Sequence, residues 1–187
     1  GTLPASAARR VTSRPTVAAA MLLRTGQVDA ALAGGAGDWW RHMTYAMPII
    51  PRRKDVSRIY ALSALILQNG TLFMCDTHVN VDPTAEQVAE MTLLAAEAVR
   101  GFGVTPKVAL LSHSSFGASN SPPARKMREA LSLLRARAPD LEVDGEMHAD
   151  AALSEVQRAV YVSSSPLKGS ANLLVMPTLD AANISFN

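Results

Sequence analysis

An apolar segment that runs through a polar turn into a long helical pattern constrains the fold of this chain more than any other feature. Residues 71–75 read Thr-Leu-Phe-Met-Cys, which is typical of a buried strand. The helical pattern starts after Pro83, where Thr84 and Gln87 have the spacing of a capping box. The turn between them therefore lies at the carboxyl end of a strand and the amino end of a helix.

Polar residues crowd this turn: Asp76, His78, Asn80 and Asp82. Ligands bind at the carboxyl ends of strands in open α/β sheets, so the position suggests a binding site. A plain turn rich in Asn, Asp and Pro would have a similar sequence. Both readings remain open for each of these residues.

Short apolar runs alternate with longer helical patterns along the whole chain, which predicts an α/β fold with a mostly parallel sheet. Strands are predicted at 29–33, 59–67, 71–75, 107–112, 141–144 and 172–176. Helices are predicted at 15–25, 84–101, 121–138 and 150–160, with a last one starting near Asp180. Asn69-Gly70 is a type I′ turn signal, so 59–67 and 71–75 should form an antiparallel hairpin.

Composition limits the class of protein. The chain has 187 residues, of which 48% are hydrophobic and 18% charged, so we expect one domain spanning 1–187 with a real core. The formal charge of +2 is too small, and too evenly spread, for nucleic-acid binding. No run approaches the ~20 apolar residues of a membrane span, so a cytoplasmic protein without membrane contact is expected.

Cys75 is the only cysteine, which excludes an internal disulfide and a cysteine-based zinc site. Its place in an apolar strand predicts a buried, unreactive thiol. The chain starts with Gly1 and stops at Asn187, shortly after the last helix begins. We therefore expect a C-terminally truncated piece of a longer fold.

A serine-rich loop follows the predicted strand 107–112 and leads to the amino end of a helix. Free amides and hydroxyls at such a place suit phosphate, although a flexible polar loop needs no ligand. The loop lacks the Gly-Lys-Ser/Thr of a Walker A motif. Its candidate ligand residues are Ser112, Ser114, Ser115, Gly117, Ser119 and Asn120.

A glycine-rich stretch follows the predicted strand 29–33 and carries two tryptophans with Arg41 and His42. An indole ring beside a guanidinium group suits a nucleotide. Exposed Trp and Arg are equally typical of protein interfaces.

Acidic residues gather with His148 on the turn expected after the strand at 141–143. Asp144, Glu146 and Asp150 make a metal site conceivable, but a turn at Asp144 and a helix cap at Asp150 explain them more simply. No metal site is predicted. Asp180 and Asn183 complete the candidates at another strand-to-helix turn, and together these turns predict a cleft.

Several of these segments resemble the phosphate acetyltransferase (phosphotransacetylase) family, and specifically the form fused to bacterial NADP-dependent malic enzymes. The segments that carry the resemblance are 76–87, 110–117, 121–131, 140–152 and 172–184. Ser112-His-Ser114 and Glu146-Met-His148 resemble the malic-enzyme form, whereas free-standing transferases differ there.

The resemblance implies a three-layer α/β/α fold like that of isocitrate and isopropylmalate dehydrogenases, usually as a dimer. Free-standing members pass an acetyl group between coenzyme A and phosphate. The Ser-Arg pair and Asp of those enzymes fall beyond Asn187, and Thr44 stands where they carry an arginine. No catalytic residue is therefore assigned.

The resemblance predicts an oligomerising, acetyl-CoA-binding regulatory domain attached to a malic-enzyme catalytic domain. NADP and a divalent metal would bind only in that catalytic domain, which oxidatively decarboxylates malate to pyruvate. The alternatives are an active phosphate acetyltransferase and a structural dimerisation module. The predicted ligand-binding residues are Arg41, His42, His78, Asn80, Ser112, Ser114, Ser115, Gly117, Ser119, Asn120, Asp144, Asp180 and Asn183.

Overall fold

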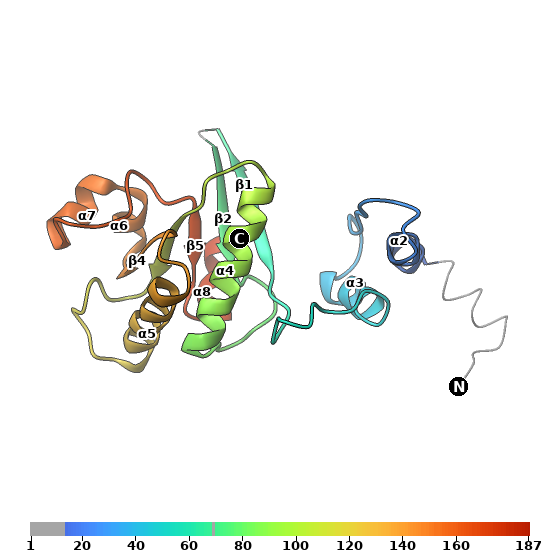
Figure 1. The fold of residues 1–187 in the computed structure, drawn as a ribbon, viewed down its shortest axis with the longest axis horizontal. Helices are drawn as coiled ribbons and strands as arrows, with labels where there is room; N and C mark the ends of the chain where they lie inside the picture. The colour runs from blue at the N-terminus through green and yellow to red at the C-terminus, as the bar shows by residue number, and fades with distance from the viewer. Residues whose placement is uncertain (1–13, 69) are drawn as a thin grey trace. The chain divides into compact units, whose positions relative to one another are not determined.

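The structure, a computed structural model, describes residues 14–68 and 70–187. The chain divides into two compact units, Gly1–Val56 and Ser57–Asn187. Figure 1 traces the ribbon from the helices of the first unit to the sheet of the second.

In the described part of the second unit, five strands form one sheet in the order β1-β2-β5-β3-β4. Their bounds are Leu62–Leu67 for β1, Gly70–Cys75 for β2, Leu173–Val175 for β5, Lys107–Leu111 for β3 and Glu142–Met147 for β4. β1 and β2 are antiparallel, and β2, β5, β3 and β4 are parallel to their neighbours. The predicted mostly parallel sheet with an antiparallel hairpin is confirmed.

Helices cover both faces of this sheet (Figure 1). On one face lie α4 (Ala85–Gly101) and α5 (Pro122–Arg137), and on the other lie α6 (Ala149–Leu153) and α8 (Leu179–Phe186). The short α7 (Glu155–Tyr161) follows α6. The second unit therefore has the predicted three layers.

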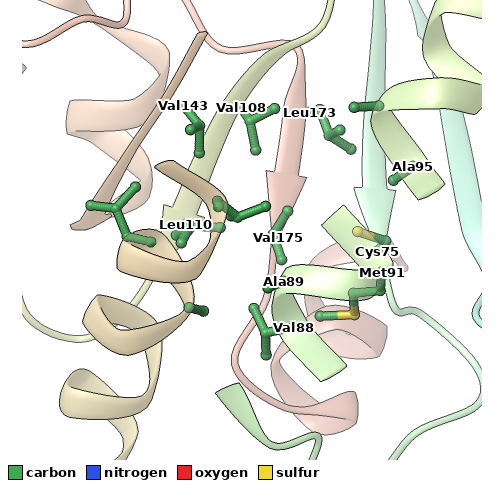
Figure 2. Close-up of a cluster of buried hydrophobic side chains, with 14 of the residues drawn as sticks. Cys75, Val88, Ala89, Met91, Ala95, Val108, Leu110, Val143, Leu173 and Val175 are labelled. Atoms are coloured by element: carbon green, nitrogen blue, oxygen red, sulfur yellow. The ribbon is translucent and has the colours of Figure 1, made fainter. Parts of the chain in front are cut away.

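The two hydrophobic cores follow from the alternation of side chains along each strand. Phe73 and Cys75 of β2 face α4 and α5, whereas Met74 faces α6 and α8. Figure 2 shows Val175 and Leu110 packed among the buried side chains of the first core. Because both faces are covered, the central strands are apolar at nearly every position.

The helix ends match their sequence signals. Thr84 and Gln87 form the predicted capping box at the start of α4. α5 begins with proline in its first turn and ends with Arg135 and Arg137, whose charges suit the negative end of the helix. These local signals fix where both covering helices begin and end.

The predicted hairpin pairs as expected, with Leu67 opposite Gly70. The turn residue Asn69 lies outside the described residues, so the type I′ turn stays a prediction. β1 starts at Leu62, three residues later than predicted, and β4 continues through Met147.

Two predicted elements are wrong. Residues 29–33 do not form a strand, because they are exposed and the described part of the first unit contains no strand with which they could share hydrogen bonds. The helix predicted at 150–160 is broken at Ser154, whose extended backbone and side-chain hydroxyl start α7 instead. Serine is favoured at the start of a helix because its hydroxyl accepts a hydrogen bond from a backbone N–H, here that of Gln157.

The described part of the first unit contains two helices, α2 (Pro15–Arg24) and α3 (Trp39–Ala46). They are joined by a hydrogen bond of 2.7 Å between Thr16 Oγ1 and His42 Nδ1. The guanidinium of Arg14 also lies 4.5 Å from the ring centre of Tyr45. Among the described residues of the whole chain, no helix combines the length and apolar character needed to cross a membrane.

Candidate functional site

Four loops share one edge of the sheet because the strands that precede them are parallel. These loops follow Cys75, Leu111, Met147 and Val175, and together they are called here the strand-end rim. The parallel strands thus bring these four loops to one edge, and the cleft expected among them stays a prediction. This is the edge at which α/β sheets bind ligands.

Asp76 organises the loop after β2. Its side chain is 3% exposed and accepts hydrogen bonds from the backbone N–H groups of Ala61, His78, Val79 and Asn80 at 2.9 to 3.2 Å. Its Oδ2 also accepts from Asn80 Nδ2 at 2.6 Å. A carboxylate with this many donors holds the loop in one conformation.

The loop after β2 also contacts α8. The rings of His78 and Phe186 meet edge to face, with centroids 5.8 Å apart. Asn183 Nδ2 donates to the backbone oxygen of Thr77 at 3.2 Å, while Asp180 is exposed in the first turn of α8. The structure thus places His78, Asn80 and Asn183 together.

Lys126, which the sequence analysis missed, joins two loops of the strand-end rim. Its Nζ donates to Asp82 Oδ1 at 2.5 Å and to the backbone oxygen of Pro177 at 2.7 Å. These acceptors belong to the loops after β2 and β5. Nothing in the helical pattern around Lys126 marks it as different from the other basic residues of α5.

The loop after β3 is built around Glu146, whose side chain is 0% exposed. Glu146 Oε1 accepts from Ser114 Oγ at 2.7 Å, from the Gly117 backbone N–H at 3.0 Å and from Arg128 at 2.9 Å. Its Oε2 has no hydrogen-bond partner among the described residues. A buried carboxylate therefore gathers the serine loop and a basic side chain of α5.

Arg128 fixes the far side of the same loop. It donates to the backbone oxygen of Ser119 at 2.9 Å and to Asn120 Oδ1 at 3.2 Å, in addition to its bond with Glu146. Its side chain is 30% exposed. Arg128 of α5 therefore brings a partly exposed positive charge to this loop. The sequence pattern did not reveal it, because α5 carries several arginines at similar spacing.

Three further hydrogen bonds connect residues within the serine loop. The Ser119 N–H donates to Ser114 Oγ at 2.9 Å, and the Ser121 N–H donates to Ser119 Oγ at 3.1 Å. Ser114 N–H donates to Ser112 Oγ at 3.3 Å. In this conformation the N–H groups of Ser114, Gly117 and Ser119 are occupied, so an anion that used them would have to replace these partners.

The loops after β3 and β4 are also bonded to each other. The His148 N–H donates to Ser115 Oγ at 3.1 Å, and His148 Nε2 donates to the backbone oxygen of His113 at 2.9 Å. The Ser112 N–H donates to the backbone oxygen of Met147 at 3.0 Å. These contacts bring Ser112, Ser114 and Ser115 into one network.

Asp144 differs from its predicted placement. It lies inside β4 and not on the turn after it, because the strand continues to Met147. Its carboxylate accepts from Arg135 at 2.9 Å and from Ser165 Oγ at 2.6 Å. Asp144 therefore joins α5 to the segment before β5.

The acidic residues near His148 have separate partners. Asp150 lies in the first turn of α6 and accepts from the Ala151 N–H at 2.7 Å. Within residues 14–68 and 70–187, no three His, Cys, Asp or Glu side chains are grouped as metal ligands. The structure offers no arrangement there to which a metal role can be attached.

Arg41 and His42 belong to the first unit. The segment predicted as a loop after a strand is the helix α3, and His42 Nε2 donates to the backbone oxygen of Ala36 at 3.0 Å. Trp39 and Trp40 meet edge to face with centroids 5.3 Å apart, and Arg41 is exposed. The role of Arg41 and His42 in ligand binding stays a prediction.

Cys75 lies at the end of β2 and is 1% exposed. Burial raises the pKa of its thiol far above the ordinary value, and the neighbouring charge of Asp76 acts in the same direction. Burial thus favours the neutral thiol, and the predicted burial of Cys75 is confirmed, whereas its low reactivity stays a prediction.

These features define a three-layer α/β/α domain whose strand-end rim is built from hydrogen-bonded polar loops. The chain belongs to the family described as phosphate acetyl/butaryl transferase, whose model matches residues 1–187. The family resemblance seen in the sequence is thereby confirmed.

Relatives with known names agree with this assignment. The chain is 49% identical to an NADP-dependent malic enzyme of Escherichia coli over 100% of the chain, and it spans 25% of that enzyme's length. It is 36% identical to a phosphate acetyltransferase of Paracoccus denitrificans over 92% of the chain, which is 56% of that enzyme.

A solved structure has the same fold. The phosphotransacetylase of Streptococcus pyogenes superposes with a TM-score of 0.82 and 31% sequence identity. The match covers 91% of this chain and 53% of the streptococcal chain. The predicted phosphotransacetylase fold is confirmed.

Proposed function

We propose that this chain is the regulatory, acetyl-CoA-binding and oligomerising phosphotransacetylase-like part of an NADP-dependent malic enzyme. One observation supports this above the others. The two segments that resemble the malic-enzyme form, 112–114 and 146–148, hydrogen bond directly to each other at the strand-end rim. The residues that set this form apart thus build a single network beside the presumed ligand site.

Binding of a coenzyme A thioester would use the polar groups of the strand-end rim. The ligand carries several phosphates, and phosphate favours guanidinium and backbone N–H donors. Arg128 is partly exposed there, beside Asn120 and the N–H of Gly117. A phosphate that engaged Arg128 would compete with Glu146, so ligand binding would rearrange the loop after β3.

Regulation requires more than binding. A ligand changes the activity of an attached catalytic domain only if it binds two arrangements of the protein with different affinity. In this proposal the two arrangements are two conformations of the loop after β3. They exist because the same hydrogen-bond donors can serve either Glu146 or an anion. In this proposal malate, NADP and a divalent metal are bound by the attached malic-enzyme domain and not by this chain.

An active phosphate acetyltransferase is the second candidate, and membership of the transferase family supports it. In that case positioning and charge stabilisation would perform the transfer of acetyl between the thiol of coenzyme A and phosphate. A structural dimerisation module without a ligand is the third.

One experiment separates the three functions. The complete protein is titrated with acetyl-CoA while malate-dependent NADPH formation and, separately, acetyl phosphate formation are followed. A change in NADPH formation without acetyl phosphate supports the regulatory function. Acetyl phosphate turnover supports the transferase, and no response in either assay contradicts both and leaves the structural module.

A further inference from the structure

Arg158 is a buried cation to which no carboxylate of the described residues is hydrogen bonded. It is 1% exposed, although the rest of α7 is exposed. Its guanidinium donates to the backbone oxygens of Ala151, Leu167 and Gly169, each at 2.8 Å. All these acceptors are neutral, and no acidic side chain of the described residues forms an ion pair with Arg158.

One donor of this guanidinium is also unused. The Nε of Arg158 is buried and has no hydrogen-bond partner among the described residues. A buried charged group without its full set of partners is costly, so an acceptor is expected next to it. An anion near the guanidinium would offset its uncompensated charge.

Arg158 lines a small cavity that has the chemistry of an anion site. Lys168 brings a second cation to its wall, and Ser163 and Ser165 bring hydroxyl groups. The cavity has a volume of about 40 Å³. Because one water needs about 10–15 Å³ on this measure, the space suits a small ion and not a nucleotide.

Glu155 is the acidic side chain of this wall, and it is already engaged. Its Oε2 accepts from the Gly169 N–H at 2.8 Å, and the residue is exposed. Lys168 donates from Nζ to the backbone oxygen of Ser165 at 3.0 Å, a neutral acceptor that leaves its charge uncompensated. Arg158, Lys168 and Glu155 are thus the charged residues that line the cavity, while Asp144 accepts from the hydroxyl of the wall residue Ser165 at 2.6 Å.

We propose that this cavity between α7 and the segment 162–168 binds a small tetrahedral oxyanion such as inorganic phosphate or sulfate. The anion accepts from Lys168 and the exposed hydroxyl of Ser163, and its charge offsets that of the buried Arg158 guanidinium. This site is separate from the strand-end rim and stands whether or not acetyl-CoA binds there. A bound oxyanion holds α7 to the segment before β5.

The test is calorimetric titration of the full chain with sodium phosphate, and separately with sodium sulfate, at constant ionic strength. Lys168→Met removes one charge of the site without disturbing the carbonyl contacts of Arg158. Arg125→Met, an exposed charge on α5, is the matched control. We expect saturable binding that Lys168→Met weakens by about tenfold, as for loss of a charge-assisted hydrogen bond, and that Arg125→Met leaves unchanged.

A second measurement locates the site. Phosphate binding is repeated with saturating coenzyme A present, and we expect it to persist because the cavity is separate from the strand-end rim. Displacement by coenzyme A would assign the phosphate to the rim and overturn the proposal. Equal phosphate affinity in Lys168→Met and the unmodified chain, or no saturable binding of either anion, would overturn it as well.

Discussion

Arg128 and Glu146 form an ion pair of 2.9 Å across very different surroundings, since the side chain of Glu146 is 0% exposed and that of Arg128 is 30% exposed. Glu146, the buried partner, loses more hydration than Arg128 does. Its charged form therefore depends on the hydrogen-bond donors around it. The pair therefore controls the conformation of the loop after β3 more than a surface ion pair would.

Replacing Arg128 should destabilise the chain because it leaves the Glu146 charge buried with fewer donors. We expect Arg128→Met to lower the free energy of unfolding by about 2–3 kcal/mol, measured by urea denaturation. Adding Glu146→Gln should recover part of this loss, because the uncompensated charge is removed. Arg125→Met is the control, expected to stay within about 0.5 kcal/mol. Strictly additive effects of the two substitutions would contradict the coupling.

Asp76→Asn should loosen the loop after β2. The substitution keeps the shape of the side chain but removes its charge and turns an acceptor into a donor that faces backbone N–H groups. We expect a loss of about 3 kcal/mol in unfolding free energy. Asp180→Asn, at an exposed position, serves as the control in the same urea experiment. Similar effects of the two substitutions would show that Asp76 does not organise the loop.

Gly145 lies where β4 passes close to β3, and a side chain should not fit there. Its φ is +149°, and a Cβ would lie 2.7 Å from the backbone oxygen of Leu110. Gly145→Ala should cost about 3 kcal/mol or more. Gly101→Ala is the matched control, because open space surrounds that position and its backbone is helical. Thermal unfolding of the two variants compares them directly, and equal melting temperatures would refute the close approach.

Stability should fall at high pH through Tyr60. Burial, followed by its hydrogen bond to Glu90, raises the pKa of Tyr60 from 10.0 to about 12. The folded state thus favours the neutral phenol, so this stabilisation is complete below pH 10.0 and is lost as the pH rises from there through about 12.

Urea unfolding at several pH values in this range measures the effect of Tyr60. Tyr60→Phe should reduce the slope of stability against pH. Absorbance at 295 nm should show one tyrosine that ionises late in the folded chain and normally in urea. A late tyrosine that remains after Tyr60→Phe would assign the raised pKa to another residue.

Local signals in the sequence predicted most of the fold. The capping box at Thr84 and the prolines at the start of α5 fixed helix ends because they act over a few residues. The apolar runs of β2, β3 and β5 were recognised because both faces of those strands are covered. Residues 29–33 were misassigned because an apolar run alone does not provide a neighbouring strand.

The candidate site was predicted only in part, for a physical reason. The serines and Asn80 stood out because they lie in turns, where polar residues are conspicuous. Glu146 lies inside a strand, and Lys126 and Arg128 lie on a helix among other basic residues. Their importance comes from contacts between segments far apart in the chain, which no local pattern contains.

The position of β5 has a consequence for biosynthesis. β5 is the last of the five strands that the structure describes, yet it lies between β2 and β3, which do not pair with each other. A nascent polypeptide must therefore hold the β1–β2 hairpin and the β3–α5–β4 segment as two unjoined halves. The gap between the two halves can close only after residues up to Val175 have emerged from the ribosome. Until then both edges of each half are open, four in all, and can bind chaperones or pair wrongly.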